Sequence, residues 1–312
     1  MSKQIDRLYQ LYRRRISRCR TENQLNKLHI ALENYLTPAE ARHLRVAAAW
    51  EPLDSPSRRW AARLEGFFPI GNARPVEFQR RGIFKGMTLY TADVGSTARK
   101  SLIIGFAGHF HRLMLPMPWL LDCLNPAAYD VIVLRDFSRT RFALGIPGLG
   151  GTFFDVLANL PRHVDPRWYR NAIALGTSGG GIPAVLASIA LGFDRGVSVC
   201  GRDFHDFASK LPDSGVNAEP YAALLASRQR PFPELVLVYG ADNRGDAAAA
   251  NALAKLVPSR LSEVENCAEH TVLAWALTQG RLPALMTEVL GQSVESGDRV
   301  AKTHGQPHGQ SG

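Results

Sequence analysis

The segment from residue 171 to residue 192, NAIALGTSGGGIPAVLASIALG, constrains the fold more than any other part of the chain. It joins an apolar run of strand length to an apolar segment of helical length, and the glycine-flanked Ser178 lies between them. Glycines at such a junction allow a strand to turn into a helix so sharply that the serine hydroxyl becomes exposed. The segment therefore predicts a nucleophile elbow, G-x-S-x-G, centred on Ser178.

Two other interpretations of this segment stay open at this point. Ser178 could simply cap the helix that follows it. Alternatively, Gly179, Gly181 and Ala184 fit the G-x-G-x-x-G/A fingerprint of dinucleotide-binding folds. Asp203 follows the next apolar run, about where such a fold places the acid that binds the ribose. That fingerprint usually opens its domain, whereas several strand-like runs precede Ser178, which favours the nucleophile.

A nucleophilic serine needs an acid that orients its base, and the acid is expected just after a later strand. The apolar run from residue 234 to residue 240, ELVLVYG, is followed by Asp242, which we take as the acid. Asp246 directly precedes a helical segment, residues 247–256, and is interpreted first as its N-cap. Asp246 is also the alternative acid.

The base is expected last in the chain. Residues 259–266 have the pattern of an edge strand, and His270 follows them just before a helical run. It is the only histidine after both Ser178 and Asp242 that does not belong to the polar C-terminal tail. The order serine, aspartate, histidine, with each residue at a strand end, predicts a catalytic triad.

An oxyanion hole requires backbone N–H groups directed at the developing negative charge. Gly179 follows the nucleophile and would supply one donor. The second donor is expected in the loop after the apolar run at residues 102–106, where Gly108 and His109 are the candidates. A metal site at His109 and His111 is not predicted, because no third ligand follows at a recognisable spacing.

These motifs resemble the α/β-hydrolase superfamily, and the resemblance covers roughly residues 75–291. It implies an α/β-hydrolase fold in which an antiparallel hairpin precedes a mostly parallel eight-stranded sheet with helices on both faces. The alternation of strands and helices independently implies a covered parallel sheet. We expect strands at residues 75–81, 83–93, 102–106, 130–136, 171–176, 196–201, 234–240 and 259–266. We expect helices at about 117–125, 152–161, 180–191, 247–256 and 271–289.

The chain departs from the family pattern at two places. The loop after the third strand lacks the His-Gly pair or HGGG sequence of many members, which leaves the second oxyanion donor open. The connection from residue 203 to residue 231 is too short for a large lid domain. We therefore expect a fairly open site.

The first 70 residues lie outside the hydrolase pattern and are predicted to form a helical appendage. Helix starts are indicated at Thr21, with Gln24 completing a capping box, and at Thr37, with Glu40 doing the same. An apolar stripe on the first helix predicts packing against the hydrolase body or a second subunit, so a homo-oligomer is possible. The basic cluster of this appendage is Arg13, Arg14, Arg15, Arg18 and Arg20.

The basic cluster could attract an anionic partner or surface, and a solvated face is the plainer alternative. No nucleic-acid motif supports a nucleic-acid partner. Residues 292–312 have few apolar side chains, which indicates a disordered tail. No apolar run is long enough to span a membrane and no signal core opens the chain, so we expect a cytoplasmic protein.

The four cysteines are scattered without C-x-x-C spacing, so we expect neither a zinc site nor a disulfide framework, and no cofactor or metal. With 312 residues and 46% apolar composition, the chain can bury one large α/β core. The resemblance implies a serine esterase that acts on an ester-type acyl substrate, and we expect a small-molecule or glycan-linked acyl substrate. Two alternatives stay open: an acyltransferase that moves an acyl group to a sugar or other hydroxyl, and a catalytically silent hydrolase-like scaffold.

Overall fold

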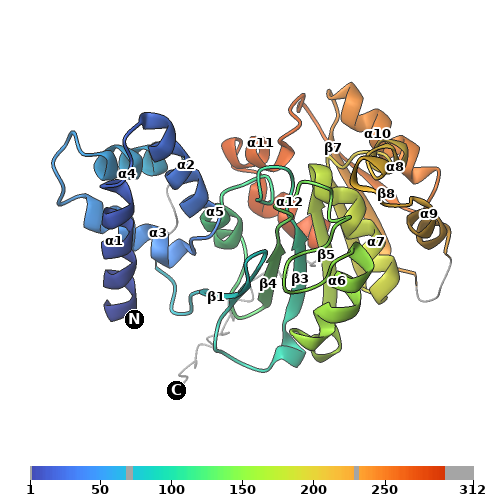
Figure 1. The fold of residues 1–312 in the computed structure, drawn as a ribbon, viewed down its shortest axis with the longest axis horizontal. Coiled ribbons are helices and arrows are strands. Elements are labelled where there is room, and N and C mark those ends of the chain that lie inside the picture. Colours follow the sequence, from blue (N-terminus) through green and yellow to red (C-terminus); the bar gives the residue numbers. More distant parts are fainter. Residues whose placement is uncertain (1, 68–72, 228–231, 292–312) are drawn as a thin grey trace, which may run out of the picture.

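The computed structural model describes residues 2–67, 73–227 and 232–291, and an eight-stranded sheet lies at its centre (Figure 1). The strands are β1 (Gln79–Phe84), β2 (Met87–Thr91), β3 (Ser101–Phe106), β4 (Tyr129–Leu134), β5 (Asn171–Thr177), β6 (Arg195–Val199), β7 (Glu234–Gly240) and β8 (Arg260–Val264). Their order in the sheet is β1-β2-β4-β3-β5-β6-β7-β8. Strand β2 pairs antiparallel with β1 and β4, and the six strands from β3 to β8 run parallel.

The parallel strands are buried on both faces, as their apolar sequences require. In β3, Leu102, Ile104 and Phe106 point into the core on one side of the sheet, whereas Ile103 points into the core on the other side. Successive side chains of a β-strand point to opposite faces of the sheet. Each strand therefore contributes to two separate hydrophobic cores.

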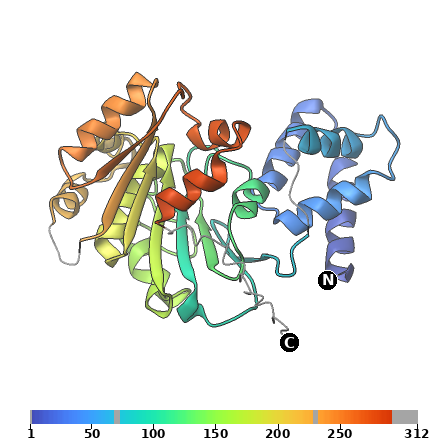
Figure 2. The same ribbon diagram turned by 180° about the vertical axis from the view of Figure 1, so that it is seen from behind.

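Helices cover both faces of the sheet, as Figure 1 and the reverse view in Figure 2 show. On one face lie α6 (Phe153–Asn159), α7 (Gly181–Leu191), α8 (Phe204–Ser209), α9 (Glu219–Ala226) and α10 (Arg244–Ala254). On the other lie α5 (Met117–Asp122), α11 (Val272–Thr278) and α12 (Leu282–Leu290). Short 3-10 helices are η1 (Thr97–Arg99), η2 (Leu160–Arg162), η3 (Pro166–Trp168), η4 (Ser178–Gly180) and η5 (Pro212–Ser214).

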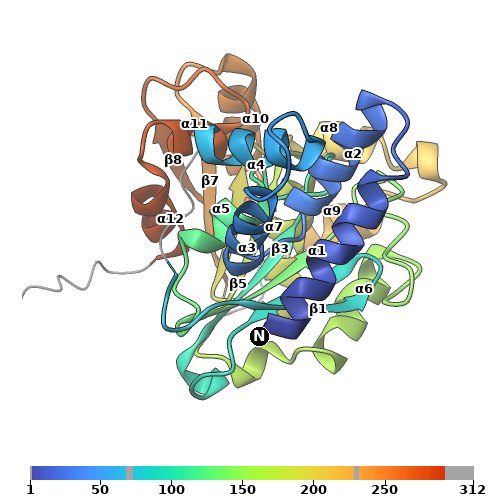
Figure 3. The ribbon, with the colours of Figure 1, turned by 90° about the vertical axis from the view of Figure 1, so that its left-hand side faces the viewer.

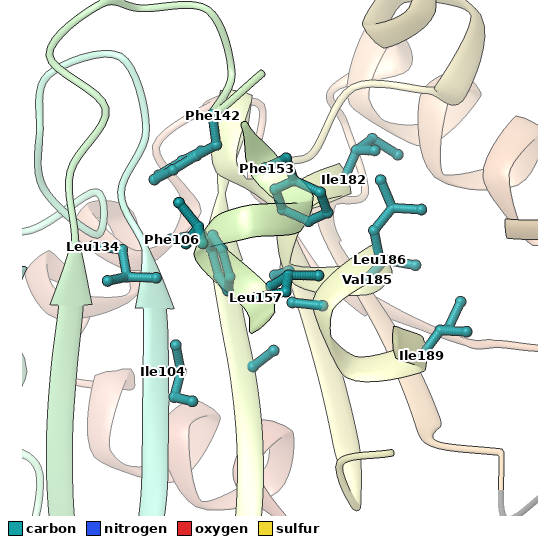
Figure 4. Close-up of a cluster of buried hydrophobic side chains, with 14 of the residues drawn as sticks. Ile104, Phe106, Leu134, Phe142, Phe153, Leu157, Ile182, Val185, Leu186 and Ile189 are labelled. Carbon is teal, nitrogen blue, oxygen red and sulfur yellow. The ribbon is translucent and has the colours of Figure 1, made fainter. Parts of the chain in front are cut away.

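The first of the two cores holds the strand-to-helix junction at Ser178 in place. Figure 4 shows α7 laying Ile182, Val185 and Leu186 against aromatic side chains that include Phe153. Phe106, the last residue of β3, packs edge-on against a second aromatic ring of the same core, that of Phe142. The helix that follows the junction and the neighbouring strand β3 are therefore fixed in the same core.

This arrangement confirms the α/β-hydrolase fold class that the sequence predicts, with an antiparallel hairpin followed by a parallel sheet.

One helix prediction is wrong. Residues 271–289 form two helices, α11 and α12, because Gly280 adopts a left-handed φ of 65° and interrupts the run. The connection from residue 203 contains α8 and α9, which were not predicted.

Four helices precede the sheet and lie against its β1 edge and α5, as the side view in Figure 3 shows. They are α1 (Ser2–Ile16), α2 (Glu22–Glu33), α3 (Pro38–Ala48) and α4 (Pro56–Phe67). A small core joins them to Trp119 of α5, so they pack against the hydrolase body, one of the two predicted surfaces. The domain boundary at residues 70 to 75 stays a prediction, and the predicted tail at 292–312 lies outside the described residues.

The basic cluster is exposed on α1 and just beyond it, and Arg13 forms an ion pair with Glu51 at 3.1 Å. Binding of an anionic partner by this cluster stays a prediction. Cys19, Cys123, Cys200 and Cys267 are free thiols in the structure. Across residues 2–67, 73–227 and 232–291, no helix combines the length and apolar character needed to cross a membrane.

Candidate active site

Ser178 lies at the sharp turn between β5 and α7, where the sequence predicted an elbow. Its backbone φ is 51°, in the left-handed region that residues with a side chain rarely adopt. Such strain persists only where the surrounding structure holds it, and it is common at functional sites. The Ser178 side chain is half-buried, and its hydroxyl faces the carboxyl end of the sheet.

Two glycines make this turn possible because the backbone segments around them approach too closely for a side chain. A Cβ at Gly176 would collide with the Gly180 carbonyl and lie 2.7 Å from the Ala184 Cβ. A Cβ at Gly180 would collide with the carbonyl of Phe106 at the end of β3. The glycine pattern in the sequence therefore has a steric cause in the structure.

His270 connects Ser178 to a buried carboxylate. Its Nε2 lies 2.9 Å from the Ser178 Oγ, and its Nδ1 lies 2.9 Å from both oxygens of Asp246. With the proton on Nδ1, His270 donates to Asp246 and accepts the hydrogen bond that the serine hydroxyl donates. The Asp246 side chain is 3% exposed and the His270 side chain 35%, so the acid is enclosed while the base stays open to solvent.

The choice of Asp242 as the acid is wrong in this geometry, because the carboxylate beside His270 is that of Asp246, the alternative. Asp246 was first interpreted as the N-cap of α10, and that interpretation is also wrong. Asn243 is the N-cap, and its side-chain oxygen accepts a hydrogen bond from the Asp246 N–H at 3.0 Å. Asp246 therefore lies in the first turn of the helix, where its side chain can reach the histidine.

Asp242 holds the histidine loop in a different way. Its side chain is exposed, but its backbone N–H donates to the Cys267 carbonyl at 3.1 Å. The Asn243 side chain also donates to the Ala268 carbonyl at 3.2 Å. The loop after β7 is thus tied by hydrogen bonds to the loop that carries His270.

The predicted oxyanion donors are only partly available. The Gly108 N–H donates to the Arg112 carbonyl at 3.1 Å, so the expectation that Gly108 could be a donor is wrong. Among the described residues, none accepts a hydrogen bond from the His109 N–H. His109 and Gly179 line the same cavity as Ser178, and a donor role for these two stays a prediction.

A cavity of about 390 Å³ opens beside Ser178. Loops that follow β3, β4, β5 and β6 line it, together with residues around η5. The lining residues are Ala107, Gly108, His109, Asp136, Arg139, Thr140, Arg141, Phe142, Ser178, Gly179, Arg202, Lys210, Asp213 and Ser214. Sequence analysis did not identify the loop from residue 136 to residue 142, nor the basic side chains of the lining. Arg139 and Arg141 belong to that loop, whereas Arg202 and Lys210 come from segments far from it in the sequence.

One group of side chains in the described part of the chain is close enough to hold a metal ion. The ligand atoms of Cys200, Asp246 and His270 all lie within 4.8 Å of one another. Metal binding by cysteine requires the thiolate. Burial, together with the nearby Asp246 carboxylate, raises the pKa of the Cys200 thiol and so favours its neutral form. We therefore interpret Cys200 as a packing neighbour of Asp246.

The dinucleotide-binding alternative is contradicted at its acidic residue. Asp203 is the N-cap of α8, and its side chain accepts a hydrogen bond from the Asp206 N–H at 2.8 Å. Ser178, in turn, is hydrogen-bonded to His270 rather than acting as a helix cap. The junction after β5 thus has the geometry of a nucleophile elbow.

The chain is similar to solved structures of hydrolases at low sequence identity. The α/β hydrolase MGS-MChE2, from the metagenome of lagoon sediments at Mar Chica, Morocco, is 17% identical with a TM-score of 0.44, over 68% of this chain and 96% of that one. The dienelactone hydrolase of Anabaena variabilis is 13% identical with a TM-score of 0.47, over 70% and 98%. An esterase of the bacterial hormone-sensitive lipase family is 15% identical with a TM-score of 0.46, over 82% and 97%. No family model and no curated protein matches the chain.

Proposed function

We propose that this chain is a serine hydrolase that cleaves an ester through an acyl-enzyme, with Ser178, His270 and Asp246 as its triad. The observation that carries the proposal is the continuous hydrogen-bonded path from the serine hydroxyl through the imidazole to a buried carboxylate, with 2.9 Å at each step. Three side chains from three different strand ends converge in this path. That arrangement is what nucleophilic catalysis by serine requires.

In the first half of the reaction, the Ser178 Oγ attacks the carbonyl carbon of the ester while its proton passes to His270 Nε2. The tetrahedral intermediate then collapses, the bond from carbon to the alcohol oxygen breaks, and His270 returns the proton to the departing alcohol. In the second half, water attacks the acyl-enzyme by the same route. This attack releases the carboxylic acid and restores the Ser178 hydroxyl.

Asp246 has the role of fixing the imidazole. As an acceptor beside Nδ1, its carboxylate keeps the Nδ1 proton in place, so that Nε2 is free to accept the serine proton. The negative charge also stabilises the imidazolium that forms in the transition state. For the oxyanion, the proposed donors are the backbone N–H groups of Gly179 and His109, both of which line the cavity.

Hydrolysis is favoured over acyl transfer by the solvent access of the base. About a third of the His270 side-chain surface, 35%, is exposed, so the base lies where the protein is open to water. Transfer to another hydroxyl would require that hydroxyl to be bound and oriented well enough to compete with water.

Reaction with a fluorophosphonate tests the proposal. We expect the reagent to label the purified protein at Ser178, and we expect Ser178→Ala and His270→Ala to abolish labelling. Ser214→Ala is the matched control, because Ser214 lines the same cavity without a histidine partner, and it should label normally. A folded wild-type protein that is not labelled would overturn the triad and favour a catalytically silent scaffold, and labelling at another serine would overturn the triad alone.

A further inference from the structure

The cavity beside Ser178 contains more positive than negative side chains. Four cationic side chains line it, against two carboxylates. The cations are Arg139, Arg141, Arg202 and Lys210, and the carboxylates are Asp136 and Asp213.

Two of these side chains already have partners within the protein. The Asp136 carboxylate accepts hydrogen bonds from the backbone N–H groups of Ser138 at 2.9 Å and Phe142 at 2.8 Å. Arg141 forms an ion pair with Asp206 at 2.9 Å and also donates to the Asp206 carbonyl. Arg141 therefore needs no ligand to balance its charge, whereas the Asp136 carboxylate is hydrogen-bonded and keeps its negative charge.

The other three cations have no such compensation. Within the described residues, Arg139, Arg202 and Lys210 form no ion pair, and neither do the two cavity carboxylates, Asp136 and Asp213. Three positive charges against two negative charges leave an excess of one. All three cationic side chains are exposed, so they are free to turn toward a ligand.

These cations surround the nucleophile from different directions. Arg139 belongs to the loop after β4, Arg202 follows β6, and Lys210 follows α8. In the sheet, β3 and β5 lie between β4 and β6, and Ser178 follows β5. Arg139 and Arg202 therefore come from strands on opposite sides of the one that carries Ser178.

We propose that the substrate is an ester that carries an anionic group, a carboxylate, phosphate or sulfate, within reach of Arg139, Arg202 and Lys210. This inference rests on the proposed function, because it names the substrate class of the same site. Like charges gathered around one cavity repel one another, and a bound anion relieves that repulsion while accepting charge-assisted hydrogen bonds. The guanidinium groups also match the planar, bidentate geometry of carboxylate and phosphate oxygens.

Two pairs of esters test where the anionic group lies. In the first pair the charge is in the acyl part: p-nitrophenyl hydrogen glutarate against neutral p-nitrophenyl valerate. In the second it is in the alcohol part: 4-acetoxybenzoate against neutral 4-acetoxybenzamide. Turnover by Ser178→Ala gives the background to subtract. We expect kcat/KM to favour the anionic ester by roughly tenfold or more in one pair, the value of one charge-assisted hydrogen bond.

Substitutions test which residues recognise the charge. Arg139→Gln, Arg202→Gln and Lys210→Gln should each lower the ratio of anionic to neutral kcat/KM several-fold, and added NaCl should lower it in the wild type. Arg99→Gln is the control, because Arg99 is exposed in η1 at the amino end of β3, opposite the site, and should leave the ratio unchanged.

A binding measurement separates this inference from the proposed function. Calorimetry with inorganic phosphate on the Ser178→Ala protein should show binding that weakens in the added Arg202→Gln variant and persists with Arg99→Gln. Ester hydrolysis with no preference for the anionic ester in either pair would overturn the inference and leave the hydrolase standing. Phosphate binding without labelling of Ser178 would overturn the hydrolase and leave the anion site. Absence of phosphate binding would overturn the inference in either case.

Discussion

The side-chain amide of Asn34 donates a hydrogen bond to the backbone carbonyl of Phe110 at 3.0 Å, which joins the N-terminal helices to the loop that carries His109. A second link runs through Arg135, a fully buried guanidinium that donates to the carbonyls of Asn34 at 2.6 Å and His111 at 3.0 Å. The Tyr35 ring lies 4.1 Å from the same guanidinium. The N-terminal helices therefore brace the loop beside Ser178.

We expect Asn34→Leu to slow fluorophosphonate labelling of Ser178 by about tenfold, because small displacements of catalytic groups cost much of the rate. The substitution removes the donor to Phe110 and keeps the backbone bond to Arg135. It should also lower the free energy of unfolding by about 1 kcal/mol, the net contribution of one hydrogen bond, since the Phe110 carbonyl loses its partner. Labelling rates and urea unfolding measure the two effects. A loss of stability with an unchanged labelling rate would show that these helices support the fold alone.

The acid of the triad can be identified by comparing two neighbouring aspartates. Asp246→Asn should lower kcat by about four orders of magnitude, because the amide no longer fixes the required imidazole tautomer. Asp242→Asn is the control, since Asp242 contributes a backbone N–H that the substitution keeps, and it should change kcat less than threefold or so. Equal losses in the two variants would remove the assignment of Asp246.

The left-handed backbone at Ser178 predicts an unusual order of stabilities. The free energy of unfolding, measured with urea, should be about 1 kcal/mol higher for Ser178→Gly than for Ser178→Ala. Alanine keeps the steric cost of a φ of 51°, and glycine does not. Ala248→Gly, at an exposed position inside α10, is the control and should be destabilising. If Ser178→Ala were the more stable variant, the backbone at the elbow would carry no strain.

Much of the fold follows from local patterns, and the triad partly does. The capping box at Thr37 and Glu40 is present as predicted, because all of its partners lie within one turn. At Thr21 the prediction is half right: the threonine caps α2, but the Gln24 side chain accepts from the Arg20 N–H instead of completing the box. The Gln24 side chain can reach the backbone N–H of either Arg20 or Thr21, and the sequence does not show which of the two it binds.

The acid was misassigned for a related reason. Placing it directly after β7 selects Asp242, and the sequence does not show that Asn243 takes the N-cap and leaves Asp246 in the first turn. The anionic-substrate cavity could not be predicted at all. Arg139, Arg202 and Lys210 are separated by many residues, and only the sheet order brings their segments together.

Acid pH should destabilise the loop beside Ser178 through His111. Burial, with a contribution from the nearby Arg139, lowers the pKa of the His111 imidazole, and its buried Nδ1 has no hydrogen-bond partner in the described structure. The folded protein therefore binds this proton less tightly than the unfolded chain, whose histidine pKa is about 6.5. The stability contribution is complete above that pH and is lost as the pH falls toward the lower folded pKa.

Melting temperatures measured from about pH 7.5 to pH 5 should accordingly fall less in His111→Phe than in the wild type. His163→Phe is the matched control, because His163 lies near η2, away from the cavity, and should leave the wild-type slope in place. Parallel slopes for the wild type and His111→Phe would exclude the effect.

The fate of the acyl group follows from the exposure of His270. In a site open to solvent, the acyl-enzyme is exposed to water at a concentration on the order of 55 M. Another hydroxyl can therefore outcompete water for the acyl group only if binding gives it a large effective molarity. We expect short-chain p-nitrophenyl esters to yield mainly the free acid, with added simple alcohols or sugars diverting only a minor share. Product analysis by mass spectrometry measures that share, and Ser178→Ala supplies the background. Predominant transfer to a sugar hydroxyl at millimolar concentration would identify an acyltransferase, because only a bound and oriented acceptor could outcompete water to that extent.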